Sequence, residues 1–228
     1  MTTASYAPVP LRIDFVSDVM CPWCAVGLAS LEQALARLGD EVRADLHFQP
    51  FELNPQLGPE GESVAEHLQK KYGLSEAQLA DNQERIRQRG AELGFTFNME
   101  GRRRIVNTFD AHRLLHWAGT EGRQAQLKHA LLRAYFTDGR DVSDHATLAE
   151  IAASAGLPAE RANALLASDE FAAEVRAEEQ GFLRMGISGV PAVIIEQRHL
   201  ISGGQPVEVF ERALREIAAT KRSGDSGT

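Results

Sequence analysis

The sequence predicts an α/β fold that is built from both ends of the chain and interrupted by an all-helical insertion. Near the N-terminus, two segments alternate apolar and polar residues as half-buried strands do. From Val64 to Met185 that alternation is lost, and apolar residues recur at helical spacing instead. β-branched residues return from Val193 onward. The predicted boundaries are residues 1–62 and 187–228 for the sheet-containing domain and residues 63–186 for the helical insertion.

The N-terminal segment predicts a strand, a cysteine motif, a helix and a second strand, in that order. Leu11–Val16 alternates apolar and polar residues, and Cys21-Pro22-Trp23-Cys24 follows directly. Ala25–Leu38 carries leucines at helical spacing, and Gly39 is expected to end that helix. Val42–Phe48 alternates again and predicts the second strand.

The middle of the chain predicts a series of short helices with glycines at the breaks between them. Gly73, Gly94, Gly122 and Gly156 mark such breaks. The predicted helices are Val64–Tyr72, Glu76–Leu93, Thr108–Gly119, Gln124–Phe136, Ala146–Ala155, Ala159–Leu166 and Glu170–Met185.

The C-terminal segment predicts two short strands followed by one helix. The strands are Ala192–Glu196, which is β-branched, and Arg198–Ser202, with a tight turn between them. Val207–Ala219 has apolar residues on one face and predicts the helix. The Ser/Gly-rich tail, Lys221–Thr228, is expected to be frayed.

The composition is that of an ordinary globular protein with an acidic balance. The chain has 228 residues, with 24 Lys and Arg against 32 Asp and Glu, and a formal net charge of −8. This balance argues against a protein that grips nucleic acid phosphates. No segment has the pattern of a secretory signal or a membrane span, so we expect a cytoplasmic protein with no membrane partner.

The two cysteines of the chain form one Cys-x-x-C unit, Cys21 and Cys24, whose loop is too small to staple a fold. At the start of a helix, Cys21 would face unpaired N–H groups and the positive end of the helix dipole, which favour its thiolate. Cys24 would lie on the same helical face and could resolve a mixed disulfide formed at Cys21. Pro22 suits the first helical turn, and Trp23 offers an apolar surface beside the exposed sulfur.

A zinc site is the main alternative for a Cys-x-x-C unit. A structural zinc site needs four ligands, and the sequence has no second cysteine pair. Its histidines include a His112/His116 pair at i, i+4, which could lie on the surface or in the core. The sequence therefore favours redox chemistry and predicts no metal.

Val190-Pro191 directly precedes the β-branched strand near the C-terminus. A proline that opens a strand can be trans and purely structural. A cis bond here would turn the chain and leave neighbouring backbone free to pair with an extended substrate. The residues alone leave both forms open.

These motifs, in this order, resemble the DsbA-type thioredoxin superfamily and, within it, the cytoplasmic FrnE-like proteins. The resemblance implies a thioredoxin-like fold with a mixed sheet, a helical insertion and a cis bond at Pro191. It is carried by Asp18-Val19-Met20-Cys21-Pro22-Trp23-Cys24, Pro50-Phe51-Glu52-Leu53-Asn54-Pro55, Asn107-Thr108, Ala111-His112-Arg113, Gly189-Val190-Pro191 and Ile201-Ser202-Gly203-Gly204-Gln205.

The resemblance also implies which residues surround the cysteine pair. Pro191 and Val190 would shape the substrate groove, and the stretch containing Asn107 and His112 would face the active site. The alternative is that Asn107 or Thr108 only caps a helix. The basic run Arg102-Arg103-Arg104 is expected to be a solvated loop rather than an anion site.

The function predicted is that of a thiol–disulfide oxidoreductase or isomerase that acts on protein or small-molecule substrates through Cys21 and Cys24. No cofactor is expected beyond this pair, with glutathione open as a co-substrate and a separate redox partner required. Two alternatives stay open. One is a glutathione-dependent isomerase or transferase similar to the kappa-class transferases and 2-hydroxychromene-2-carboxylate isomerases, and the other is a redox-sensitive holdase. The sequence leaves open the direction of electron transfer and the oligomeric state, a homodimer included.

Overall fold

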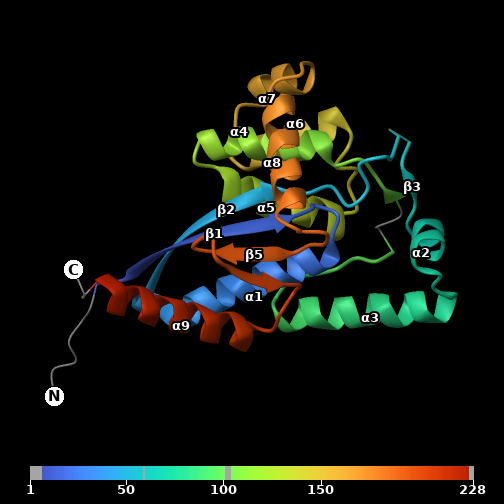
Figure 1. Ribbon diagram of the computed structural model, residues 1–228. Coiled ribbons are helices and arrows are strands. Elements are labelled where there is room, and N and C mark those ends of the chain that lie inside the picture. Colours follow the sequence, from blue (N-terminus) through green and yellow to red (C-terminus); the bar gives the residue numbers. More distant parts are fainter. Residues whose placement is uncertain (1–6, 59, 101–103, 226–228) are drawn as a thin grey trace.

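The computed structural model describes residues 7–58, 60–100 and 104–225, and its centre is a four-stranded mixed sheet (Figure 1). The strand order is β2-β1-β5-β6. β1 (Val9–Ser17) pairs parallel with β2 (Val42–Pro50) and antiparallel with β5 (Ala192–Ile195), which pairs antiparallel with β6 (His199–Ser202). The sheet is therefore built from the two ends of the chain, as the sequence predicts.

Helices cover both faces of this sheet. α1 (Pro22–Leu38) and α9 (Val207–Asp225) pack on one face (Figure 1), and the other face is packed against three helices of the middle section, α4 (Phe109–Thr120), α5 (Gln124–Phe136) and α8 (Ala172–Arg184). Within β1, Leu11, Ile13 and Phe15 are fully buried in the main core, because every second side chain of a strand points to the same face.

The predicted helices of the middle section are confirmed, with ends that shift by no more than two residues. They are α2 (Val64–Tyr72), α3 (Glu76–Glu92), α4 (Phe109–Thr120), α5 (Gln124–Phe136), α6 (His145–Ser154), α7 (Ala159–Leu166) and α8 (Ala172–Arg184). Local capping explains several of these boundaries. Ser75 and Gln78 form a reciprocal capping box at the start of α3, and the Asp144 carboxylate caps α6.

A short β-ribbon in the middle section was not predicted. β3 (Glu62–Ser63) pairs antiparallel with β4 (Arg104–Ile105) outside the central sheet. Strands of two residues are too short to show a period-two pattern, so the sequence gives no signal for them. The ribbon joins the segment before α2 to the segment before α4, and it sets the pair α2 and α3 apart from the helices on the sheet (Figure 1).

The predicted fraying of the C-terminal tail from Lys221 is wrong up to Asp225, because α9 continues that far. The Lys221 Nζ atom donates to the carbonyl of Pro10 at 2.8 Å and to the Glu196 carboxylate at 2.6 Å, which ties the last turns to β1. Residues 226–228 lie outside the described residues. Within the described chain, no helix combines the length and apolar character needed to span a membrane.

Candidate active site at the start of helix α1

Both cysteines of the motif lie where the sequence places them, at the first turn of α1. Cys21 is the N-cap residue and Pro22 the first helical residue, and the N–H of Cys24 donates to the carbonyl of Cys21 at 3.0 Å. Both thiols are free. Cys24 is fully buried, and Cys21 is only 5% exposed, which is less than the partial exposure expected from the helix geometry alone. The difference arises because neighbouring segments close over the helix start.

The two thiols have opposite electrostatic surroundings. A hydrogen bond with the Cys24 thiol and the N–H groups of Cys24 and Trp23 lower the pKa of Cys21, against the opposing effects of burial and of the Asp18 charge. Burial and the adjacent Cys21 sulfur raise the pKa of Cys24 well above its usual value. Cys21 is therefore the thiol that ionises first, as a nucleophile should, and Cys24 holds its proton.

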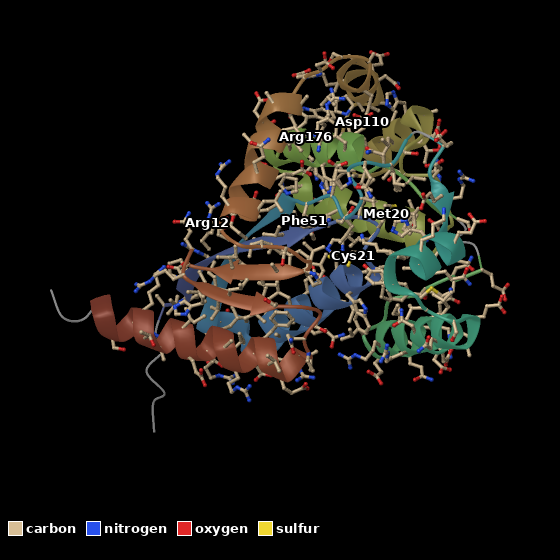
Figure 2. The ribbon with its side chains drawn as sticks, turned by 45° about the vertical axis from the view of Figure 1, so that its right-hand side comes forward. Arg12, Met20, Cys21, Phe51, Asp110 and Arg176 are labelled. Carbon is tan, nitrogen blue, oxygen red and sulfur yellow. The ribbon has the colours of Figure 1, made fainter. Side chains whose placement is uncertain are left out.

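The segment before β5 lies directly against the nucleophile. The Val190–Pro191 peptide bond is cis, which confirms the prediction from the family resemblance. The Cys21 Sγ atom lies 3.6 Å from the carbonyl oxygen of Val190, and the carbonyl of Pro191 accepts a hydrogen bond from the N–H of Gly203 at 2.8 Å. Gly27 makes this approach feasible, because a Cβ at that position would lie 3.0 Å from the Cγ atom of Pro191. Figure 2 shows Cys21 at the end of α1 that faces β5 and the helical insertion.

A cavity of about 710 Å³ opens beside Cys21. Its near wall is Met20 with the Cys21-Pro22-Trp23 segment, and its far wall comes from α2 and α3. Apolar side chains of that far wall include Leu68, Tyr72 and Ile86, and polar ones include Lys71, Gln78 and Arg85. The volume lies in the range typical of sites for small molecules. Of the residues predicted to bind substrate, Pro22, Trp23 and Val190 line this cavity.

Asp18 connects three of the sequence motifs just behind the nucleophile. Its side chain is fully buried, and its carboxylate accepts hydrogen bonds from the N–H of Leu53 at 2.8 Å and of Met20 at 3.4 Å. The Nε2 atom of His112 lies 3.6 Å from its Oδ1 atom. Burial raises the pKa of Asp18, but the neighbouring His112 and the hydrogen bonds from Leu53 and Thr108 outweigh burial and hold that pKa below its usual value.

Asn107 and His112 do not line the cavity beside Cys21, so they are not placed to contact a substrate bound there. The Asn107 Oδ1 atom accepts a hydrogen bond from the N–H of Phe109, the first residue of α4, at 2.9 Å. Asn107 therefore supports the start of this helix from one position before the N-cap residue, Thr108, whose side chain makes no capping bond. His112 is buried against Asp18 and lines a second, polar cavity of about 240 Å³. Arg102 and Arg103 lie outside the described residues, and Arg104 donates to the carbonyl of Gly61 at 3.2 Å.

Sequence reasoning missed Lys128, a fully buried lysine close to the cysteine pair. Burial lowers the pKa of Lys128, while negative charge on Cys24, Asp18 and Cys21 opposes that shift. A signal was present, because Lys128 lies on the same face of α5 as buried leucines three and four residues further along. Lysine is almost never fully buried unless it is paired, so a lysine on the apolar face of a helix indicates either that this position is open to solvent or that its charge has a functional role.

No set of zinc ligands is assembled near the cysteines. Within residues 7–58, 60–100 and 104–225, no three His, Cys, Asp or Glu side chains gather in an arrangement that could hold a metal ion. The pair Cys21 and Cys24 is accompanied instead by one carboxylate, Asp18, and one ammonium group, Lys128. These four groups can stabilise one cysteine as a thiolate and accept or donate one proton.

Comparison with known proteins identifies the class to which this fold and site belong. The sequence model of the family described as DSBA-like thioredoxin domain matches residues 12–215, and the chain therefore belongs to that family. A solved structure of a probable DsbA oxidoreductase from Streptomyces coelicolor is 37% identical, with a TM-score of 0.86 over 90% of this chain and 89% of that one.

Two further similar proteins are more distant. The uncharacterized protein YwbO of Bacillus subtilis is 25% identical over 205 residues, which cover 90% of this chain and 96% of YwbO. The cytosolic disulfide reductase DsbM of Pseudomonas aeruginosa, solved with glutathione, is 19% identical with a TM-score of 0.62, over 90% of this chain and 98% of that one. The likeness to DsbM shows the shared fold.

Proposed function

We propose that this DsbA-family chain is a thiol–disulfide oxidoreductase of the FrnE-like type in which Cys21 is the nucleophile and Cys24 the resolving thiol. The Cys21 thiolate attacks a disulfide R–S–S–R, forming a mixed disulfide and releasing one R–S⁻, which takes up a proton from solvent. Cys24 then loses its proton and attacks the Cys21 sulfur, which forms the Cys21–Cys24 disulfide and releases the second thiolate. The substrate gains two electrons and the cysteine pair loses two.

One observation carries this proposal: the sulfur of lower pKa stands at the mouth of a cavity, and the sulfur of higher pKa is buried directly behind it. Cys21 lies between the carbonyl of Val190 and the N–H groups at the start of α1 and also lines the cavity, which gives a substrate sulfur an approach to it. Trp23 and Val190 line that approach. The reverse reaction oxidises a substrate dithiol and needs a separate redox partner to reoxidise the pair. Isomerisation starts with the same attack by Cys21, and a substrate thiol then displaces Cys21, so no net electrons are transferred.

Trapping of the mixed disulfide tests this division of labour between the cysteines. Cys24→Ser should accumulate a covalent adduct with a small disulfide such as bis(2-hydroxyethyl) disulfide, seen as a mass increase by intact-protein mass spectrometry. Cys21→Ser, the matched control, should accumulate none because its remaining thiol is buried. An adduct on Cys21→Ser that forms faster than the one on Cys24→Ser would contradict the assignment.

The volume and the charged lining of the cavity beside Cys21 favour a small thiol, such as glutathione, as one substrate of this chain. Lys71 is held at the cavity by bonds from its Nζ atom to the carbonyl of Leu53 at 3.1 Å and to Asn54 Oδ1 at 2.9 Å, and Arg85 adds a second cation. Two cations suit the two carboxylates of glutathione, the ligand present in the DsbM structure. Calorimetric titration of Cys21→Ser with glutathione should show binding that Lys71→Met weakens several-fold.

Two measurements, one on the unmodified chain and one on Cys21→Ser, separate the alternative functions. A glutathione-dependent isomerase that only positions the tripeptide would bind it but would not oxidise Cys21 and Cys24 in a glutathione redox buffer. A holdase would suppress the aggregation of a denatured client as well with Cys21→Ser as with the unmodified chain. We expect neither outcome, and we expect the protein to act in the cytoplasm, where dithiols are kept reduced.

A further inference from the structure

The buried pair of Asp18 and His112 lies outside the substrate cavity but touches both its chemistry and a second cavity. Asp18 lies in the turn just before the nucleophile, and its carbonyl accepts a hydrogen bond from the N–H of Cys21 at 3.2 Å. The Nε2 atom of His112 lies 3.6 Å from Asp18 Oδ1, with side-chain exposures of 1% and 0%. Nε2 has no geometrically complete hydrogen bond among the described residues, and the Asp18 carboxylate is the charged group recorded within ion-pair distance of it.

His112 also lines the polar cavity of about 240 Å³. Among the residues that the structure describes, none lines both this cavity and the substrate cavity. Arg12 of the second cavity and Cys21 of the first lie on opposite sides of Phe51 in Figure 2. Protons can therefore reach the His112 ring from solvent without passing the substrate. The other titratable or charged groups around His112 are Arg12 of β1, His47 of β2, Glu52 after β2, His116 of α4 and Glu178 of α8.

The charge of this pair acts on the nucleophile. A bare Asp18 carboxylate disfavours the Cys21 thiolate, since the two are like charges in a buried setting. A protonated His112 beside Asp18 cancels most of that charge, and a neutral His112 does not. Lys128, the nearby buried ammonium group, counters the same charges but is sealed from the second cavity.

We propose that His112 is a positioning residue that sets the reduction potential of the Cys21–Cys24 pair, by controlling how much negative charge Asp18 presents to Cys21. The inference rests on the proposed function, because it concerns the reduction potential of the same two cysteines. A His112 proton supplied through the second cavity stabilises the Cys21 thiolate and hence the reduced protein. The pair is then more oxidising, because its reduced form is favoured.

The test compares the Cys21 thiolate titration, followed by absorbance near 240 nm, in four variants. His112→Gln should raise the apparent pKa of Cys21 by about 1 unit, because the Asp18 charge is no longer cancelled. Asp18→Asn should lower it, and adding His112→Gln to Asp18→Asn should change it little. His116→Gln is the matched control: it removes a histidine one turn along α4 that lines the same cavity but contacts Glu178 at 3.4 Å instead. It should leave the thiolate titration unchanged.

An unchanged titration in His112→Gln, or an equal rise in the presence and absence of the Asp18 carboxylate, would overturn the proposal. The reduction potential of the Cys21–Cys24 pair, measured in a dithiothreitol redox buffer, provides a second readout. It should be more negative in His112→Gln than in the unmodified chain, because the reduced protein loses stabilisation of its thiolate, and unchanged in His116→Gln. Equal potentials in the unmodified chain and His112→Gln would also overturn the proposal. None of these readouts needs a substrate, so failure of the trapping experiment would refute the proposed function separately.

Discussion

Replacing Arg113 with methionine should destabilise the fold by about 3–5 kcal/mol, although Arg113 lies outside the substrate cavity. The guanidinium is 4% exposed and donates to the carbonyls of Glu170 at 2.9 Å, Leu165 at 2.8 Å and Ser168, and to the Asp110 carboxylate at 2.7 Å. Each buried acceptor left without a donor costs about 1–3 kcal/mol, and relaxation recovers part of that sum. Breaking a buried charged group from its partners costs a similar total, about 3–5 kcal/mol.

Thermal unfolding of the reduced protein, followed by circular dichroism, measures this loss. For a chain of this length, 1 kcal/mol corresponds to about 2–4 °C in Tm, so Arg113→Met should melt roughly 6–20 °C lower. Arg133→Met on α5 is the control, because that side chain is 75% exposed and contacts Asp138 only at 3.8 Å. Its effect should stay within about 0.5 kcal/mol. A melting temperature for Arg113→Met within 2 °C of the unmodified chain would refute the reasoning.

Three further perturbations follow from the packing and the charges described above. Gly27→Ala places a Cβ 3.0 Å from the ring of the cis-proline and should cost about 1–3 kcal/mol in a thermal melt, whereas Gly181→Ala, which meets no atom within 4 Å, should gain about 0.5–1 kcal/mol. Equal effects of the two would contradict the packing argument. Burial and a neighbouring carboxylate raise the pKa of Glu52. The native state therefore binds more protons than the unfolded state just above pH 4.5, and stability falls as pH rises through that window. Glu52→Gln should flatten this part of the curve of unfolding free energy against pH, and an unchanged slope would count against it. Glu178 raises the pKa of His116, so the protonated His116 beside Glu178 stabilises the folded state. This contribution is fully present below about pH 6.5 and is lost as pH rises through the folded-state pKa. Glu178→Gln should therefore cost up to about 1 kcal/mol at pH 6 and little at pH 9, as measured by urea unfolding.

Local pattern was sufficient to predict most elements of the fold. Helices such as α5 and α7 have the predicted ends, because apolar periodicity and glycine breaks are properties of neighbouring residues. The start of α1 at Pro22 also agrees with the sequence, because proline suits the first helical position. The ribbon of β3 and β4 was missed because its strands are too short to carry a pattern.

From the residues alone, the functional residues could be predicted only where they lie together in one short sequence motif. Cys21 and Cys24 form such a motif, but the importance of Asp18 depends on Leu53, which lies 35 residues away in the chain, and on His112 of α4. An acidic residue in a loop is usually solvated, and only the assembled fold shows that Asp18 is not. The far wall of the substrate cavity could not be predicted either, because it depends on where α2 and α3 pack, and the apolar periodicity of a helix does not specify its position in the fold.

The order in which the chain leaves the ribosome has a consequence for its redox centre. β1 lies between β2 and β5, and the nucleophile stands against the carbonyl of Val190, so the centre joins residues from opposite ends of the chain. Val190 lies 169 residues after Cys21 in the chain, so both cysteines are synthesised well before the segment that packs against them. Until β5 docks beside β1, the carbonyl of Val190 does not stand against the Cys21 sulfur. The last step of assembling this redox centre is therefore the docking of a strand that is synthesised late.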